Sequence, residues 1–234
     1  MTISNVFAFD IETVPDTEFG RRLHGLEGLT DKQVGYVMQT RQREQTGSEF
    51  LSLEQHRVVA ISVAMRTREG FKAWSLGEPE SGEAELVRRF YDGIERYTPT
   101  LVSWNGSGFD LPVLNYRAMR HRLQAHRYWE MGDEDQAFRW NNYISRFHWR
   151  HVDLMDVLAG FQGRGRVGLD KMAQLLGLPG KLGLSGEGVW DAWLAGGVVD
   201  IRNYCETDVI NTYLIYLRFE LMRGRLTHEE HDRE

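Results

Sequence analysis

Residues 6–12, VFAFDIE, form an apolar, β-prone run that ends in two carboxylates. Such a run is typical of a buried strand that ends at a site. Asp10 and Glu12 are two positions apart, and because the side chains of a strand alternate between its faces, both carboxylates point the same way. Like charges that close raise each other's pKa unless a cation lies between them, so one interpretation is a divalent metal site. The alternative is a strand end with two solvated acids.

The rest of the chain alternates between predicted strands and helices. Residues 58–67 and 71–76 predict a hairpin, and residues 83–97 carry apolar side chains at the spacing of an amphipathic helix. We also expect a strand at 100–104, helices at 111–123, 169–176 and 201–223, and either a strand or a helix at 152–158. This order predicts an α/β fold, a mixed sheet flanked by helices.

The elements fit a single domain over residues 1–224. Two connections, 13–57 and 124–150, are longer than the fold needs and are treated as insertions, with a helix expected at 30–44 in the first. Residues 225–234 are almost wholly polar and are expected to form a disordered tail that contains His228 and His231.

The composition is that of a folded protein with a core. Of the 234 residues, 41% are apolar and 12% aromatic, which excludes a disordered chain. The single cysteine, Cys205, excludes an internal disulfide and a cysteine zinc site. A charged-then-apolar leader at Met1 and long uncharged apolar runs are absent, so we expect a soluble, cytoplasmic protein without a membrane partner.

The charge is acidic, with 28 Lys and Arg against 34 Asp and Glu, a formal charge of -6. This balance argues against a protein that coats nucleic acid through many phosphate contacts. It does not exclude a nuclease, because such an enzyme needs carboxylates to hold the divalent cations at its active site.

Two further motifs carry carboxylates. Asp110 follows the predicted strand at 100–104 and the Asn105-Gly-Ser-Gly turn, where it is either a site residue or a helix N-cap. Tyr204 and Asp208 are four positions apart on the last predicted helix and so share one face. For an isolated pair, the simpler interpretation is a buried tyrosine hydroxyl bonded to a carboxylate.

The motifs Asp10-Ile11-Glu12, Asn105-x3-Phe109-Asp110 and Tyr204-x3-Asp208 resemble, in order and separation, the three motifs of the DEDD superfamily of 3'-5' exonucleases, tyrosine subclass. Within it, the sequence resembles the predicted exonuclease family related to the proofreading domain of family B DNA polymerases. The resemblance spans residues 6–208. It implies a ribonuclease-H-like fold with a central, mixed five-stranded sheet.

The resemblance also implies roles for individual residues. Two divalent cations, Mg²⁺ or Mn²⁺, would be held by four acids: Asp10, Glu12, Asp110 and Asp208. Tyr204 would orient the attacking water, since a phenol with a pKa of about 10 is a poor base at neutral pH. The terminal nucleotide would be contacted by Ile11, Thr13, Asn105 and Phe109.

The implied activity is hydrolysis of single-stranded DNA or RNA from a free 3' end, releasing nucleoside 5'-monophosphates. Because 234 residues leave no room for an attached polymerase, the nuclease is expected to act alone or in trans. Two alternatives remain: an RNA-trimming exoribonuclease, and a catalytically silent nucleic-acid-binding module. The presence of all four acids and Tyr204 favours an enzyme.

Residues 115–150 mix arginines with aromatic side chains, a composition that suits single-stranded nucleic acid. The alternative is a solvated helix face followed by a partly buried aromatic cluster. Further phosphate contacts are expected from Arg164, Arg166 and Lys171. By contrast, we interpret His151, Asp153 and Asp156 as structural, although their spacing imitates a metal site.

Overall fold

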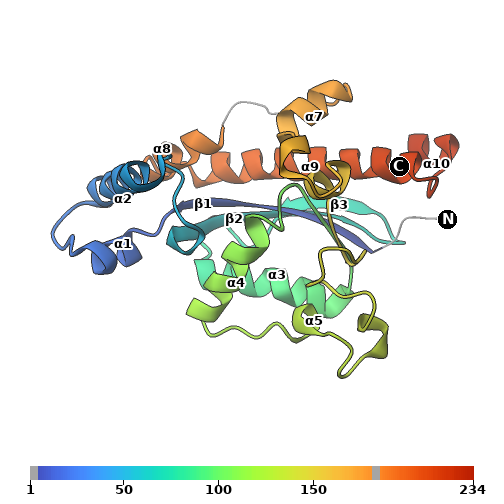
Figure 1. Ribbon diagram of the computed structural model, residues 1–234, viewed down its shortest axis with the longest axis horizontal. Helices are drawn as coiled ribbons and strands as arrows, with labels where there is room; N and C mark the ends of the chain where they lie inside the picture. Colours follow the sequence, from blue (N-terminus) through green and yellow to red (C-terminus); the bar gives the residue numbers. More distant parts are fainter. Residues whose placement is uncertain (1–4, 181–184) are drawn as a thin grey trace.

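The computed structural model describes residues 5–180 and 185–234. Its centre is a five-stranded mixed sheet with strand order β3-β2-β1-β4-β5, between helices on both faces (Figure 1). The strands are β1 (Val6–Pro15), β2 (His56–Arg66), β3 (Phe71–Ser75), β4 (Thr100–Ser103) and β5 (His151–Asp153).

Ten α-helices are described, with four 3-10 turns, η1–η4, between them. They are α1 (Thr17–His24), α2 (Asp31–Thr46), α3 (Glu83–Tyr97), α4 (Asp110–Arg120), α5 (His126–Trp129), α6 (Leu154–Leu158), α7 (Leu169–Leu175), α8 (Val189–Leu194), α9 (Val198–Met222) and α10 (His228–Arg233). The turns are η1 (Leu53–Gln55), η2 (Gln136–Phe138), η3 (Gly163–Gly165) and η4 (Gly186–Gly188).

Strand β1 is the middle of the sheet. It pairs antiparallel with β2 and parallel with β4, and β4 pairs parallel with β5. This is the mixed five-stranded, ribonuclease-H-like architecture expected from the sequence, and the fold prediction is confirmed.

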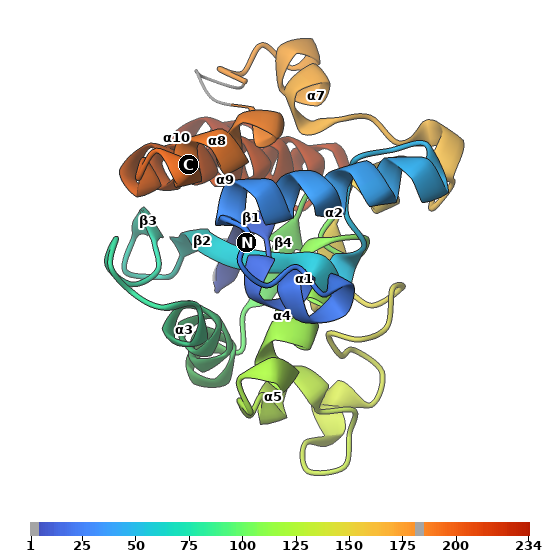
Figure 2. The same ribbon diagram turned by 90° about the vertical axis from the view of Figure 1, so that its left-hand side faces the viewer.

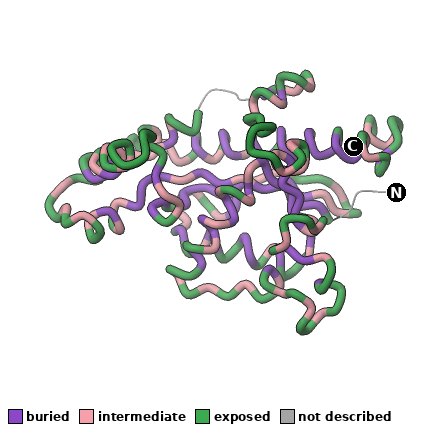
Figure 3. The backbone as a smooth tube through the Cα atoms, viewed as in Figure 1, coloured by how far each residue is buried: buried purple, intermediate pink, exposed green. Residues whose placement is uncertain are grey.

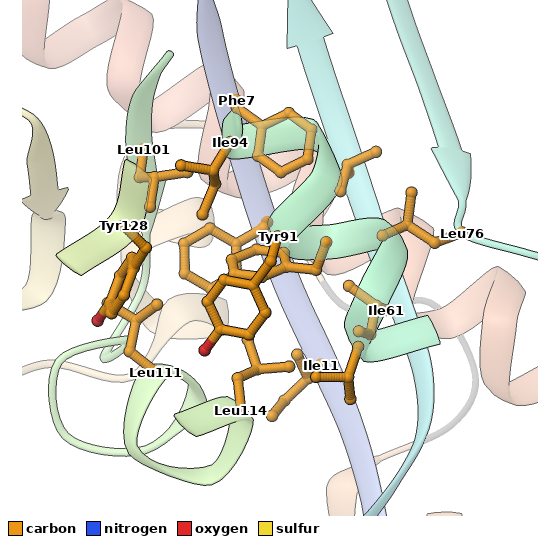
Figure 4. Packing of buried hydrophobic residues seen from close by; sticks show 14 of the residues in the cluster. Phe7, Ile11, Ile61, Leu76, Tyr91, Ile94, Leu101, Leu111, Leu114 and Tyr128 are labelled. Carbon is orange, nitrogen blue, oxygen red and sulfur yellow. The ribbon is translucent and has the colours of Figure 1, made fainter. Parts of the chain in front are cut away.

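The two faces of β1 have different partners. Phe7, Phe9 and Ile11 point into the larger core cluster, which α3 and α4 complete (Figure 4). Val6 and Ala8 belong to the opposite cluster, formed with α9. Since side chains alternate along a strand, Asp10 and Glu12 continue the α9 face.

Helix α9 lies along that face (Figure 1). Val209 and Tyr213 pack against the sheet, and the helix ends just before Gly224, whose φ of 72° only glycine adopts readily. Tyr204 and Asp208 are therefore carried to the face that bears Asp10 and Glu12.

Strand β1 is longer than the sequence indicated, since it continues past Glu12 to Pro15. The register with β2 shifts between Glu12 and Thr13, which marks a β-bulge. Bulges re-aim side chains and are common beside active sites. Here the shift comes directly after the two acids of the strand.

Most of the insertion at 13–57 is helical. Val34, Met38 and Leu51 form a small core under α2. Helix α1 packs on it at Gly20, where a Cβ would meet Met38 and Val34. Gly35 lets α2 approach α8, because a Cβ there would meet the ring of Trp190. Figure 2 shows α2 beside α8 at the end of the molecule where β1 finishes.

Two segments differ from the sequence-based expectation. Residues 152–158 are neither all strand nor all helix: β5 ends at Asp153, which caps α6. The tail is not disordered, because Thr227 and Glu230 form a capping box that starts α10, and Arg66 pairs with Glu234. Figure 3 shows α10 as a largely exposed helix next to the buried α9.

Among the described residues, no helix combines the length and apolar character needed to cross a membrane.

Candidate active site

The carboxylates of the three motifs converge at the middle of β1. Ligand atoms of Asp10, Glu12 and the thiol of Cys205 lie within 4.8 Å of one another. The Asp110 carboxylate is tied to the same strand, because its Oδ1 accepts a hydrogen bond of 3.2 Å from the Ile11 N–H. Asp208, on α9, contributes to the electrostatic field at Asp10. The site thus draws on β1, α4 and α9.

The loop before α4 sets the position of Asp110. The Asp153 carboxylate accepts the N–H groups of Asn105 and Ser107, at 3.0 and 2.9 Å. Asn105 adopts a left-handed φ of 68°. Gly106 leaves no room for a side chain, since a Cβ there would clash with Ser103. Residues of β4 and β5 therefore fix the turn that delivers Asp110.

Crowding of the acids changes their protonation. The pKa of Asp10 lies well above its ordinary value. Burial is the largest cause, and the charges of Asp110, Glu12 and Asp208 raise it further. Burial also raises the pKa of Asp110 to about 7, although the hydrogen bond from Ile11 opposes the shift. The field of this site therefore favours positive charge.

Tyr204 lies beside the same carboxylates. Its pKa is raised, and burial is the largest cause. The charges of Asp208 and Glu12 and a side-chain hydrogen bond with Asp208 raise it further. The phenol therefore remains protonated at neutral pH and serves as a hydrogen-bond donor.

Cys205 was not among the site residues predicted from the sequence. Its Sγ lies 3.5 Å from Asp10 Oδ2 and 3.4 Å from the Asp10 carbonyl oxygen. Burial, together with Asp10 and Glu12, raises the pKa of the thiol, so that it donates a weak S–H hydrogen bond. The sequence did place Cys205 on the apolar stripe of the last helix, one residue after Tyr204, and this position could have indicated that its thiol lies near the acids.

The donor set suits a hard divalent cation. Carboxylate oxygens are the ligands that Mg²⁺ and Mn²⁺ prefer, whereas the protonated Cys205 thiol is a poor one. Burial is the largest cause of the raised pKa of Asp10, and repulsion by the neighbouring carboxylates adds to it; a bound cation would offset both effects. The residues present therefore fit the expected metal.

Phe109 lies in a small aromatic group next to the acids. Its ring is 5.5 Å from that of Phe50 and 5.1 Å from that of His56, in an edge contact with His56. His56 Nδ1 lies 2.8 Å from Thr13 Oγ1, which places Thr13 against the group. Phe50 is 60% exposed. Phe50 and His56 were not predicted as site residues, because the polar 13–57 segment carries no pattern that indicates which of its residues return to the site.

The other two expected substrate residues differ in burial, since Ile11 is buried and Asn105 is partly exposed. The Ile11 side chain is buried among Leu111 and Leu114, and its N–H is bound to Asp110. This burial argues against a contact between the Ile11 side chain and a substrate. The Asn105 Oδ1 lies over Gly108, where a Cβ would meet it.

The residues interpreted as structural have structural contacts. His151 Nε2 lies 2.8 Å from Ser103 Oγ, and burial lowers the pKa of His151 to about 4. Asp153 holds the loop before α4 and caps α6, while Asp156 pairs with Arg146 and Arg166. Asp153 thus supports the site without belonging to the acidic cluster.

The fold and this cluster define an α/β protein of ribonuclease-H-like architecture with a carboxylate-lined candidate active site. A family model described as "Predicted 3'-5' exonuclease related to the exonuclease domain of PolB" matches residues 48–234. The chain belongs to this family. The matched range contains Asp110, Tyr204 and Asp208, whereas Asp10 and Glu12 precede it. A comparison with curated proteins finds no match.

Proposed function

We propose that the protein is a metal-dependent 3'-5' exonuclease of the tyrosine subclass, which removes nucleoside 5'-monophosphates from the 3' end of a single strand. The observation that carries this proposal is the convergence of Asp10, Glu12, Asp110 and Asp208 from three separate elements. Such a cluster is costly in a folded protein unless cations neutralise it.

The four acids would hold two divalent cations, which when bound lower the pKa of water and neutralise charge on the phosphoryl and leaving oxygens. Tyr204 orients the attacking water by hydrogen bonding, because its raised pKa makes it a poor general base. Cys205 donates to Asp10 and fixes the orientation of that carboxylate.

The aromatic group at Phe109 suits the terminal nucleotide. Phe109 would pack against the base or sugar, with Thr13 nearby through its contact with His56. Stacking on an aromatic ring is sequence-tolerant and is worth roughly 1–3 kcal/mol per base, which fits an enzyme that must accept any 3' end.

The test is degradation of a 5'-labelled oligonucleotide in Mg²⁺ or Mn²⁺. A ladder that shortens from the 3' end is expected, and EDTA, Asp10→Ala or Asp208→Ala should abolish it. Asp200→Ala is the matched control, since Asp200 is an exposed acid two turns before Asp208 on α9. Intact oligonucleotide with every DNA and RNA substrate would contradict the proposal, and would favour a silent binding module if binding persisted.

Tyr204→Phe separates the tyrosine from the metal ligands. Turnover should slow while metal-induced stabilisation is retained. An unchanged rate would remove Tyr204 from the mechanism.

Matched DNA and RNA oligonucleotides distinguish a deoxyribonuclease from an RNA-trimming enzyme. The two substrates differ at the 2' position, so the ratio of their kcat/KM values measures contacts to that group.

A further inference from the structure

A cleft of about 420 Å³ is lined in part by the loop that leads to Asp110. Ser107 and Gly108 of that loop line the cleft together with Trp129, Arg146 and Arg166. Its volume lies within the range of small-molecule sites. The role proposed for the four acids does not use this cleft.

Two arginines that line the cleft form ion pairs with the same buried carboxylate, that of Asp156. Arg166 Nη2 lies 2.6 Å from Asp156 Oδ1, and Arg146 Nη2 lies 2.9 Å from Asp156 Oδ2. The Arg146 and Arg166 side chains are 44% and 37% exposed. Two guanidinium groups on one carboxylate keep a net positive charge, and they are already oriented when an anion arrives.

A strained turn keeps Arg146 in place. Phe161 has a φ of 60°, which is unfavourable for a non-glycine residue, and its N–H donates to the Asp156 carbonyl at 2.8 Å. Its ring lies 5.2 Å below the Arg146 guanidinium and contacts Phe147 edge-on. Strain of this kind is found where the surrounding structure fixes a functional group.

The opposite wall is aromatic. Trp129 is 53% exposed and stands edge-on to the buried Tyr128 at 5.3 Å. Tyr128 also lines the cleft with Leu111, and Figure 4 shows the two side chains together at the edge of the core. A supported, exposed indole beside two arginines is the combination with which proteins hold single strands.

We propose that this cleft binds the part of the strand just upstream of the terminal nucleotide, with a phosphodiester on Arg146 and Arg166 and a base against Trp129. This subsite rests on the proposed exonuclease function, because its link to the acids is the loop residues Ser107 and Gly108, which line the cleft and lead to Asp110. The arginine-rich and aromatic segment at 124–150 then has a role in guiding substrate.

The experiment measures the Kd of a short 5'-fluorescent oligothymidylate by anisotropy in EDTA, over a series of salt concentrations. Arg166→Gln should raise the Kd about tenfold, the effect of one charge-assisted hydrogen bond. The slope of log Kd against log salt should fall by about 0.7, the change for one lost phosphate contact on a single strand. Arg166→Lys should restore the wild-type salt slope. Trp129→Ala should raise the Kd and leave the salt slope unchanged.

Arg88→Gln is the matched control, because Arg88 is a half-exposed, ion-paired arginine on α3 that does not line this cleft. It should bind like wild type. Circular dichroism checks that every variant is folded. Wild-type Kd and salt slope in folded Arg146→Gln and Arg166→Gln would overturn the subsite even if wild type degrades DNA. Salt-dependent binding through these arginines without any degradation would support a strand-binding cleft, but it would overturn the exonuclease and with it the position of the cleft upstream of a terminal nucleotide.

Discussion

The Ile11 N–H donates to the Asp110 carboxylate across 3.2 Å, so the first residue of α4 is bound to the strand that carries Asp10 and Glu12. One hydrogen bond thus links two motifs that are 99 residues apart in the chain. The side chain of Ile11 anchors this link in the core. Cluster geometry therefore depends on backbone contacts as well as on the acids.

Asp110→Asn removes the negative charge of this side chain and keeps its hydrogen bond with the Ile11 N–H. The amide oxygen can still accept from Ile11, so the fold should be retained, and loss of one negative charge should leave the Tm in EDTA unchanged or raise it. Wild type should gain roughly 5–10 °C in Tm at about 100 times the Kd for metal. Differential scanning fluorimetry with and without Mn²⁺ checks both. An equal gain in the variant would show that Asp110 is not a ligand.

His151 gives a pH dependence of stability. Burial lowers its pKa to about 4, against 6.5 for an exposed histidine. Between these values the unfolded chain binds a proton that the folded protein does not, so stability rises with pH by at most about 1.4 kcal/mol per unit and is lost as pH falls from 6.5 toward 4. Urea unfolding at several pH values measures the slope.

The control for this prediction is His151→Gln, whose pH dependence of stability is compared with that of wild type. The raised pKa values of Asp10 and Asp110 produce a slope of opposite sign, so only the difference between wild type and variant isolates the histidine. Identical slopes in the two proteins would mean that His151 titrates normally.

Arg117 is the centre of a buried ionic network. Its guanidinium contacts Asp16 at 2.6 Å and is bidentate to Glu83, and all three side chains are buried. Arg117→Met should lower the free energy of unfolding by about 3–5 kcal/mol. Two buried carboxylates lose their arginine, and the contacts that remain, of Glu83 with His121 and the Val58 N–H and of Asp16 with the Phe19 N–H, do not replace the guanidinium charge. The exposed pair of Arg88 and Asp92 provides the control, since Arg88→Met should cost less than about 1 kcal/mol. Similar urea midpoints for the two variants would refute the assignment.

A substitution at Gly106 tests whether the conformation of the loop before α4 is needed to position Asp110. A Cβ would clash with Ser103 Oγ, which is held by His151 and cannot move freely. Gly106→Ala should cost about 1–3 kcal/mol and also reduce exonuclease activity by displacing the turn. Gly186→Ala meets no neighbour and is the control. Full activity in Gly106→Ala would mean that the turn tolerates displacement.

Much of the fold was predictable because local patterns agreed with tertiary packing. The helix at 83–97 was predicted with the observed bounds, since Leu86, Phe90 and Ile94 form one apolar stripe. The strand at 6–12 was shorter than β1, because pairing of Thr13–Pro15 with β2 depends on a bulge that has no clear sequence signal. The tail helix did have a signal, the Thr227-x-x-Glu230 capping box, which its polar composition obscured.

Residues of the candidate site could be predicted where they belong to a sequence motif. Residues that reach the site through packing between distant segments could not. The four acids and Tyr204 could be named because their order resembled known motifs. The approach of Phe50 to Phe109, and of α2 to Trp190, arises from packing between segments without a shared pattern. The arginine pair on Asp156 was likewise hidden, because Arg146 and Arg166 flank that residue ten positions away on either side.

The claim on which the account depends is that the carboxylates of β1, α4 and α9 form one cation site. An anomalous difference map from a crystal soaked in Mn²⁺ tests this directly. We expect density between Asp10, Glu12, Asp110 and Asp208, absent when Asp10 is replaced by Asn. A map with no peak among these carboxylates, at a concentration of Mn²⁺ that supports nucleic-acid hydrolysis, would contradict it.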